Sequence, residues 1–317
     1  MSAMAKTLGG FRAAALIGWI ALSGVGIVYA RAKGIPLQTA LPVIAAFLAE
    51  YPFYLVAGFP NMRERLAGPR LPWWLMASAV LPYLICCCGG IPFQWLALVR
   101  LAALAGAISL WYLILPAAPI FDAAFLVLIA AVMVGRYFDS IYPDIYRQHI
   151  DILGHLALFH MAVLVLILER RVPETGFGFL PNWKEWRIGI LNFFYFVPCG
   201  GVLALALHAT HFVPPRLPWG AASFLGFLWV LGLTEEFFFR GVLQRWIEDW
   251  TWNATASLVI TAILFGLVHF WFRGWRWVPI AAVMGLFCGR ARNQADSIRA
   301  GVVTHALVVA TWRAFLW

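Results

Sequence analysis

Long apolar runs are the feature of this sequence that most limits its fold. Of the 317 residues, 63% are hydrophobic and only 12% are charged, about half the charged share of an ordinary soluble domain. A run of about 18 or more apolar residues can cross a bilayer as a helix, which satisfies its own backbone hydrogen bonds. The apolar segments span residues 13–30, 37–59, 72–88, 93–117, 121–138, 150–168, 188–207, 217–238, 254–271, 277–289 and 299–316. These segments predict an all-α, polytopic transmembrane helical bundle of about eight to eleven helices.

Charge and cysteine content narrow the class of protein further. The formal net charge is +9, which we assign to arginines in short loops that face anionic lipid, and not to nucleic-acid binding. The five cysteines include the run Cys86-Cys87-Cys88 and show neither a disulfide framework nor metal-finger spacing. We therefore expect a multi-pass integral protein of the bacterial inner membrane, with the lipid bilayer as its surroundings and no nucleic-acid partner.

A polar connector at residues 169–187 divides the chain into two regions. It contains several charged residues, together with Gly176 and Gly178 as helix breakers. Residues 1–171 are predicted to form an N-terminal transmembrane helical region of unknown role. Residues 185–317 are predicted to form a second region, in which ionisable groups inside apolar segments concentrate.

Two adjacent glutamates at the end of an apolar segment are the strongest sign of chemistry. A charged side chain inside a bilayer costs about 2.5–3.5 kcal/mol on insertion scales, so such a residue indicates function. Glu236 and Arg240 are four residues apart and share a helix face at about 100° per residue, which predicts an ion pair. Glu235 lies about 140° around the helix from Arg240 and is therefore the candidate for the free carboxylate of a general base. The alternative is an interfacial glutamate–arginine pair that only ends a helix.

Two histidines lie in later apolar segments. His269 follows Phe265 by four residues, so the two share a helix face, and Gly266 permits close approach of a neighbouring helix. His305 lies well inside the last segment. Each histidine alone is more typical of a satisfied interface residue. Together with the two glutamates they match what hydrolysis inside a membrane requires, which is a base for water and donors for an oxyanion.

The ordered set of motifs resembles one known family. Residues 235–240 match a Glu-Glu-x-x-x-Arg motif, residues 265–269 match Phe-x-x-x-His, and His305 matches the histidine of a His-x-x-x-Asn/Asp motif. These motifs on successive helices are the signature of the CAAX-protease and bacteriocin-processing family of intramembrane endopeptidases, also called the Abi family. The resemblance covers about residues 185–317 and leaves the N-terminal region outside.

The resemblance implies a glutamic peptidase that cuts a membrane-associated substrate. Glu235 would activate water with help from His269. His305 would stabilise the oxyanion, and Glu236 with Arg240 would hold the shape of the site. No cofactor is implied; zinc held by the carboxylates and histidines is the alternative, although the chain has no His-Glu-x-x-His motif. The substrate would be a membrane-embedded peptide or protein, either a prenylated C-terminus, a leader peptide or a sorting tail.

The sequence departs from the family at one position. Val309 stands where the family has Asn or Asp, four residues after the last histidine, a side chain that in the family helps to hold the substrate carbonyl. Loss of one oxyanion donor costs about two to three powers of ten in rate. Asn293 and Thr304 are candidate replacements, and the sequence does not choose between them.

Two other classes of function stay open on the sequence alone. A non-catalytic membrane scaffold or immunity-type protein is consistent with most of the motifs, and Val309 favours it. An ion-coupled transporter would use Glu235 and the histidines as a relay, although no paired repeat is apparent.

Outside the motifs, we expect Glu50, Asp122 and Arg100 to be interfacial or paired between helices.

Overall fold

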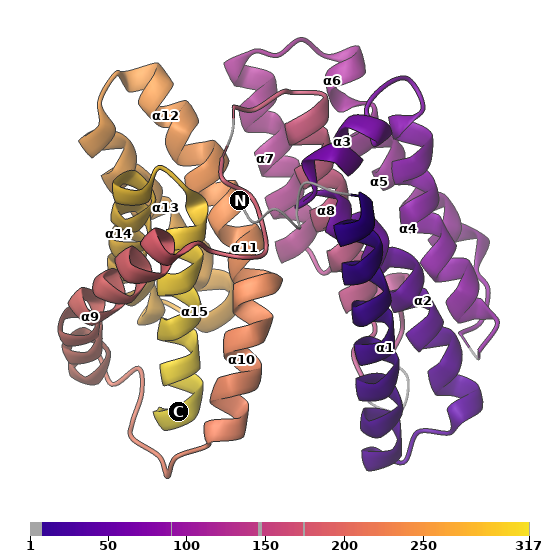
Figure 1. Cartoon of the computed structure of the whole chain (residues 1–317), viewed down its shortest axis with the longest axis horizontal. Helices are drawn as coiled ribbons and strands as arrows, with labels where there is room; N and C mark the ends of the chain where they lie inside the picture. The colour runs from indigo at the N-terminus through magenta and orange to yellow at the C-terminus, as the bar shows by residue number, and fades with distance from the viewer. Residues whose placement is uncertain (1–7, 90, 145–147, 174, 317) are drawn as a thin grey trace. The chain divides into compact units, whose positions relative to one another are not determined.

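The computed structural model describes residues 8–89, 91–144, 148–173 and 175–316. Within these ranges the regular secondary structure is helical and no strand occurs (Figure 1). Isolated bridges involve Gln148 and the antiparallel pair Phe212 and Leu316. Every one of the predicted apolar segments falls on a helix. The predicted all-α fold is therefore confirmed.

Two compact units make up the chain, Ala3–Val172 and Pro173–Trp317, here called the N-terminal unit and the C-terminal unit. The division falls within the first residues of the polar connector at 169–187. All the residues of the predicted site belong to the C-terminal unit.

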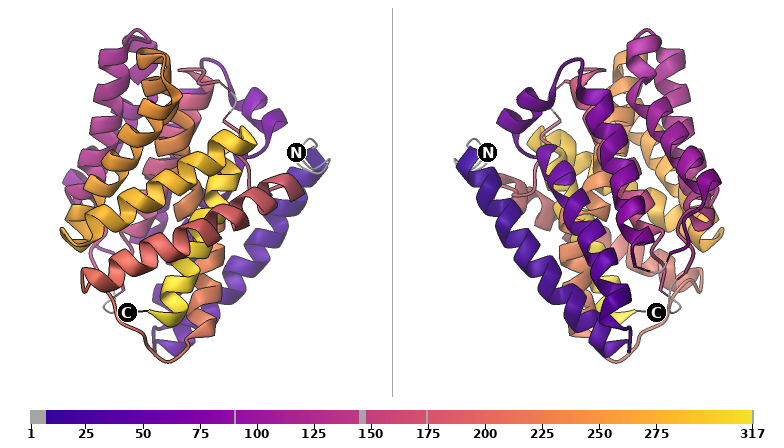
Figure 2. Two further views of the ribbon diagram at one scale, coloured as in Figure 1. Left: turned by 90° about the vertical axis from the view of Figure 1, so that its left-hand side faces the viewer. Right: turned by 90° about the vertical axis from the view of Figure 1, so that its right-hand side faces the viewer.

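The N-terminal unit is built around one enclosed helix. Its elements are α1 (Leu8–Ala32), α2 (Leu37–Val56), α3 (Pro60–Leu66), α4 (Leu71–Cys87), α5 (Trp95–Ser109), α6 (Trp111–Ile114), α7 (Pro119–Val134), the 3₁₀ turn η2 (Tyr137–Ser140) and α8 (Ile152–Leu168). Twelve of the 17 residues of α8 are buried, because α2, α4, α5 and α7 pack against it. α1 packs against α2, as the right-hand view of Figure 2 shows. Large apolar side chains of α1, such as Ile20 and Val25, are exposed, as expected of a surface that faces lipid.

Asp122 and Arg100, two of the three residues expected from the sequence to be interfacial or paired between helices, have polar partners. Asp122 is 1% exposed and accepts two hydrogen bonds of 2.7 Å from the guanidinium of Arg170. Its predicted pairing is therefore confirmed. Arg100 donates a hydrogen bond of 3.1 Å to Ser140 Oγ on an exposed face of the unit.

Glu50, the third residue expected to be interfacial or paired between helices, lies in the core of the N-terminal unit. It is 2% exposed, and its Oε1 lies 3.4 Å from Nδ1 of the fully buried His160. Nε2 of His160 lies 2.7 Å from Ser78 Oγ. Both oxygens of Glu50 nevertheless lack a hydrogen-bond partner among the described residues, which is unusual for a buried polar group.

The C-terminal unit is a second bundle with α15 at its centre. Its elements are α9 (Trp183–Ala206), α10 (Leu217–Trp229), α11 (Leu231–Glu236), the π-helix η3 (Phe237–Leu243), α12 (Gln244–Thr251), α13 (Ala254–Arg273), α14 (Trp277–Ala295) and α15 (Ile298–Phe315). α15 packs against α9, α10, α11 and α14. As a result, 11 of its 18 residues are buried, and a polar side chain on α15 is held away from lipid.

Glycines permit the close approach of helices in this unit. A Cβ atom on Gly189 of α9 would lie 2.7 Å from the carbonyl oxygen of Ala300 in α15. One on Gly266 of α13 would lie 2.5 Å from the carbonyl oxygen of Val278 in α14. Because no side chain fits at these distances, both contacts require glycine, and the predicted role of Gly266 is confirmed.

A buried ion pair joins the start of α9 to the start of α15. Nε of Arg299 donates to Glu185 Oε1 at 3.0 Å, and its Nη2 lies 2.8 Å from the same oxygen. The other oxygen of Glu185 accepts from the backbone N–H of Asn182, whose side chain accepts from the N–H of Glu185. Glu185 therefore caps α9 and binds α15 at the same time.

Several helices meet the length and hydropathy required to cross a membrane. Among the described residues, five stretches do so, namely Leu8–Ala32, Leu37–Val56, Trp183–Ala206, Leu217–Thr251 and Ala254–Arg273. A sixth arises if α3 and α4, which bend by 104°, form one broken span. α5, α7 and α8 are apolar but shorter, so fewer helices than apolar segments meet this criterion. The chain is a multi-pass helical membrane protein.

The variant Glu185→Ala tests the ion pair at the start of α9. It leaves Arg299 buried without its partner, so we expect the free energy of unfolding to fall by about 3–5 kcal/mol. Denaturant titration of the purified protein in detergent measures this change. The exposed Glu64 supplies the control, because Glu64→Ala should change stability by no more than about 0.5 kcal/mol. Equal stabilities of the two variants would contradict the prediction.

Candidate active site

The two glutamates lie where the helix geometry changes. A break at Val230, with φ −128° and ψ −82°, separates α10 from α11. Glu235 and Glu236 are the last residues of α11, and the π-helix η3 with Arg240 follows directly. π-helical turns are rare and are frequent at functional sites. The regular α-helix assumed from the sequence is wrong at this point, because a wider turn carries Arg240.

Arg240 and Glu236 form the ion pair that their spacing predicted. Both side chains are 0% exposed, and Nη1 of Arg240 donates to Glu236 Oε1 at 3.0 Å. Nη2 of Arg240 donates to the carbonyl oxygen of Gly285 in α14 at 3.2 Å. The guanidinium carbon lies 4.2 Å from the ring centre of Phe265 in α13, a cation–π contact. The pair therefore also connects η3 to α13 and α14.

His305 on α15 lies between the two glutamates. Its Nδ1 is 2.9 Å from Glu236 Oε1, the oxygen that also accepts from Arg240. An ionised carboxylate is acceptor-only, so Nδ1 carries the hydrogen and donates it. Nε2 of the same ring lies 3.8 Å from Glu235 Oε2. The bond to Glu236 thus directs the opposite edge of the imidazole towards Glu235.

Glu235 is more accessible than the neighbouring His305. Its side chain is 34% exposed, whereas that of His305 is 2% exposed. Oε2 of Glu235 is nevertheless enclosed, and none of the described residues donates a hydrogen bond to it. A buried acceptor of this kind normally has a partner, so Oε2 marks a place where a donor from outside the chain would bind.

His269 brings α13 to the same cluster. Its Nδ1 lies 2.8 Å from the carbonyl oxygen of Phe265, which makes Nδ1 the donor and leaves Nε2 as an acceptor in the neutral ring. Glu235 and His305 are among the charged groups that act on His269. The Phe265 ring contacts both imidazoles, with centroid separations of 4.7 Å and 5.8 Å. The structure therefore brings together the residues that the sequence singled out, from α11, η3, α13 and α15.

One group of side chains in this cluster has the composition of a metal site. Glu236, Cys288 and His305 are buried, and each offers one ligand atom within 4.8 Å of the others. Arg240, however, donates to the same Glu236 oxygen that Nδ1 of His305 contacts. A positive charge bound at that oxygen disfavours a second cation there. The group also omits Glu235, so these residues do not fit a catalytic zinc.

The two residues proposed to replace the missing Asn or Asp are engaged elsewhere. Oγ1 of Thr304 lies 3.0 Å from the carbonyl oxygen of Gly189 and 3.1 Å from that of Ala300, and donates to this backbone. Asn293 is exposed and accepts a hydrogen bond of 2.9 Å from Nε2 of Gln244. These hydrogen bonds do not involve the cluster, so the structure supports neither suggestion. His305 is the donor that remains on α15.

Sequence reasoning missed Gly301 and Cys288. A Cβ atom on Gly301 would lie 2.8 Å from Glu236 Oε2 and 3.1 Å from the carbonyl oxygen of Cys288. Gly301 therefore makes room for the Glu236 carboxylate against α15. The only signal in the sequence is a glycine four residues before His305, on the same helix face. The cysteine spacing in the sequence gives no sign of a role for Cys288, whereas its thiol lies beside Glu236.

Fold and site together define a helical membrane protein with paired carboxylates and imidazoles buried in one bundle. Residues 217–311 match the family model described as type II CAAX prenyl endopeptidase Rce1-like. The match spans every residue of the cluster and confirms the resemblance found in the motifs. This part of the chain is similar to the CAAX endopeptidases that the family model describes. No curated protein and no solved structure matched the chain.

The variant Gly301→Ala tests how closely α15 and Glu236 are packed. The added methyl group meets the Glu236 carboxylate and the α14 backbone, so we expect a loss of about 1–3 kcal/mol in stability. Thermal unfolding in detergent measures it. Gly226→Ala in α10 is the matched control, because a Cβ atom there meets nothing within 4 Å. If the two variants unfold at the same temperature, the close packing at Gly301 is not required.

Proposed function

We propose that the protein is an intramembrane endopeptidase that hydrolyses a peptide bond with water activated by Glu235. The observation that carries this proposal is the enclosed Oε2 of Glu235, which lacks a donor among the described residues and lies 3.8 Å from Nε2 of His305. A carboxylate acceptor beside an imidazole, partly exposed in a helical bundle, is suited to bind and deprotonate water. The match to CAAX endopeptidases supports the same activity.

The reaction proceeds in two steps. Water donates one hydrogen bond to Glu235 and one to the acceptor Nε2 of His269. Glu235 takes a proton from this water, and the oxygen attacks the carbonyl carbon of the substrate. The C–N bond then breaks while the protonated Glu235 returns its proton to the leaving nitrogen, which gives a carboxylic acid and an amine. The acid loses its remaining water-derived proton to the amine, so the products leave as a carboxylate and an ammonium group.

His305 stabilises the oxyanion of the tetrahedral intermediate. Its bond to Glu236 fixes the ring. With a proton on both ring nitrogens, the imidazolium donates from Nδ1 to Glu236 and from Nε2 to the oxyanion. Glu236 and Arg240 do not react; they hold His305 and the π-helix in position. No metal takes part in this mechanism, and the Arg240 charge at Glu236 supports that view.

The substrate is a peptide or protein embedded in the same membrane. Apolar helices surround the site, so a water-soluble peptide has no direct route to it. A prenylated C-terminus, a leader peptide and a sorting tail are the substrate classes that fit, and we propose the bacterial inner membrane as the location. For the N-terminal unit we propose only that it is a separate transmembrane region.

A non-catalytic membrane scaffold is the second candidate. Val309 favours it, because the family places an amide or carboxylate at that position. The engagement of Thr304 and Asn293 with other partners leaves this donor unreplaced. On this alternative the protein would bind membrane peptides without cutting them.

The variant Glu235→Gln separates the two candidates. Gln keeps the size of the side chain but cannot take a proton, so we expect cleavage of a membrane-peptide library to fall by about 10²–10⁴-fold. His269→Ala should lower the rate as well. Glu248→Gln and His211→Ala, both outside the cluster, should keep wild-type rates. A wild type that cuts nothing, or a Glu235→Gln variant as active as wild type, removes the protease proposal.

Chelation tests the proposed absence of a metal. Because the proposed reaction needs only protein groups and water, preincubation with EDTA or 1,10-phenanthroline should leave the cleavage rate unchanged. Cleavage by a known zinc protease, assayed in the same detergent, serves as the positive control for chelation. A loss of activity that added Zn²⁺ restores would favour a metal mechanism.

A further inference from the structure

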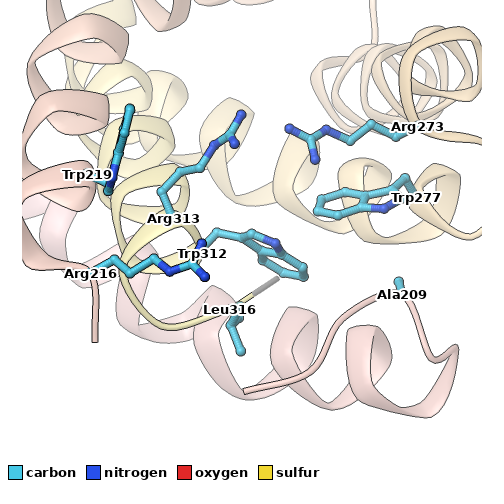
Figure 3. Close-up of a pocket in the computed structure, with 8 residues that line it drawn as sticks. All are labelled: Ala209, Arg216, Trp219, Arg273, Trp277, Trp312, Arg313 and Leu316. Atoms are coloured by element: carbon cyan, nitrogen blue, oxygen red, sulfur yellow. The ribbon is translucent and has the colours of Figure 1, made fainter. Parts of the chain in front are cut away.

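A second polar site lies at one end of the C-terminal unit. It is a cavity of about 570 Å³ whose wall includes three arginines and three tryptophans. These residues are Arg216, Arg273, Arg313, Trp219, Trp277 and Trp312, and Figure 3 shows them around the opening. No acidic residue is among the described residues that line it.

Four helices, α10, α13, α14 and α15, contribute to the wall of this cavity. The backbone N–H of Arg216, just before α10, donates to the carbonyl oxygen of Ala314 in α15 at 2.8 Å. The rings of Trp277 and Trp312 lie 4.6 Å apart between α14 and α15. The Arg273 guanidinium lies 4.5 Å from the centre of the Trp277 ring. The wall is therefore built from side chains with fixed neighbours.

The charges in the cavity are of one sign. Figure 3 shows the guanidinium groups of Arg273 and Arg313 pointing towards each other. No ion pair joins either of them to a carboxylate of the described residues, although Glu235 and Arg313 both act electrostatically on Arg273. Two facing guanidiniums repel each other, and an anion between them would relieve this repulsion through charge-assisted hydrogen bonds.

Two helices, α13 and α15, carry residues of both the cavity wall and the cluster. Arg273 follows His269 by four residues on α13, which is a rise of about 6 Å. Trp312 follows His305 by seven residues on α15, a rise of about 10 Å on the same face. An extended peptide advances about 3.3 Å per residue. About two to four residues of peptide therefore connect the general base to the arginines.

We propose that this cavity binds the free C-terminal carboxylate of the substrate peptide and so sets the distance between the cleaved bond and the end of the chain. The inference rests on the proposed peptidase function. Arg273 and Arg313 hold the carboxylate, while Trp277 and Trp312 pack against the last side chain. The phosphate of an anionic lipid has related chemistry. The peptide is the better fit because Arg273 is an electrostatic neighbour of Glu235 and shares a face of α13 with His269.

A binding experiment tests the cavity without requiring cleavage. A library of lipidated peptides with randomised final positions is made once with free carboxylates and once as C-terminal amides. Retention on the Glu235→Gln variant in detergent is then compared. We expect the acids to bind at least about tenfold more tightly than the amides, as for a charge-assisted hydrogen bond. This preference should vanish in Arg273→Gln/Arg313→Gln and persist in the nearby control Arg276→Gln.

Each outcome has a distinct meaning. Equal retention of acids and amides, including no retention of either, overturns the carboxylate site. A preference that persists in the double variant also overturns it. Binding of phosphatidylglycerol that depends on the two arginines, without a preference for peptide acids, would assign the cavity to lipid and overturn the proposal. A wild type that discriminates but cleaves nothing would sink the peptidase function while leaving the carboxylate site.

Discussion

A single buried carboxylate oxygen organises the C-terminal unit. Oε1 of Glu236 accepts hydrogen bonds from Arg240 and from His305, and Arg240 continues to α14 through the carbonyl oxygen of Gly285. The segment that forms α11 and η3 therefore meets α15 at one atom, with Glu236 and His305 69 residues apart in the chain. Breaking a buried pair by removing one partner costs about 3–5 kcal/mol, so the surroundings of this oxygen are strongly constrained. Its neighbour Glu235 is left free for chemistry.

The same packing joins the proposed catalytic cluster to the arginine-lined cavity. α13 and α15 each carry a histidine at the cluster and a cavity residue one or two turns further on. Because both helices are packed through glycines and small residues, the spacing between the two sites is fixed by the backbone. A substrate held at both points would be positioned by the fold itself, with little dependence on mobile loops.

Local patterns in the sequence predicted the structural features that depend on neighbouring residues. Apolar runs predicted the helices, because a backbone in lipid must satisfy its own hydrogen bonds. Four-residue spacing predicted the pair of Glu236 and Arg240. The π-helix was not predicted, since propensity does not distinguish it from an α-helix. The bond between Glu236 and His305, 69 residues apart, and the engagement of Thr304 depend on how helices pack, which no local pattern encodes.

The central claim is that Glu235 acts on water and not directly on the peptide bond. A single turnover in water enriched in oxygen-18, followed by mass spectrometry of the product and of the Glu235 peptide, tests it most directly. If Glu235 activates water, the label appears in the new carboxylate of the product and none appears in Glu235. Label in the Glu235 side chain, as expected of a covalent intermediate, would contradict it.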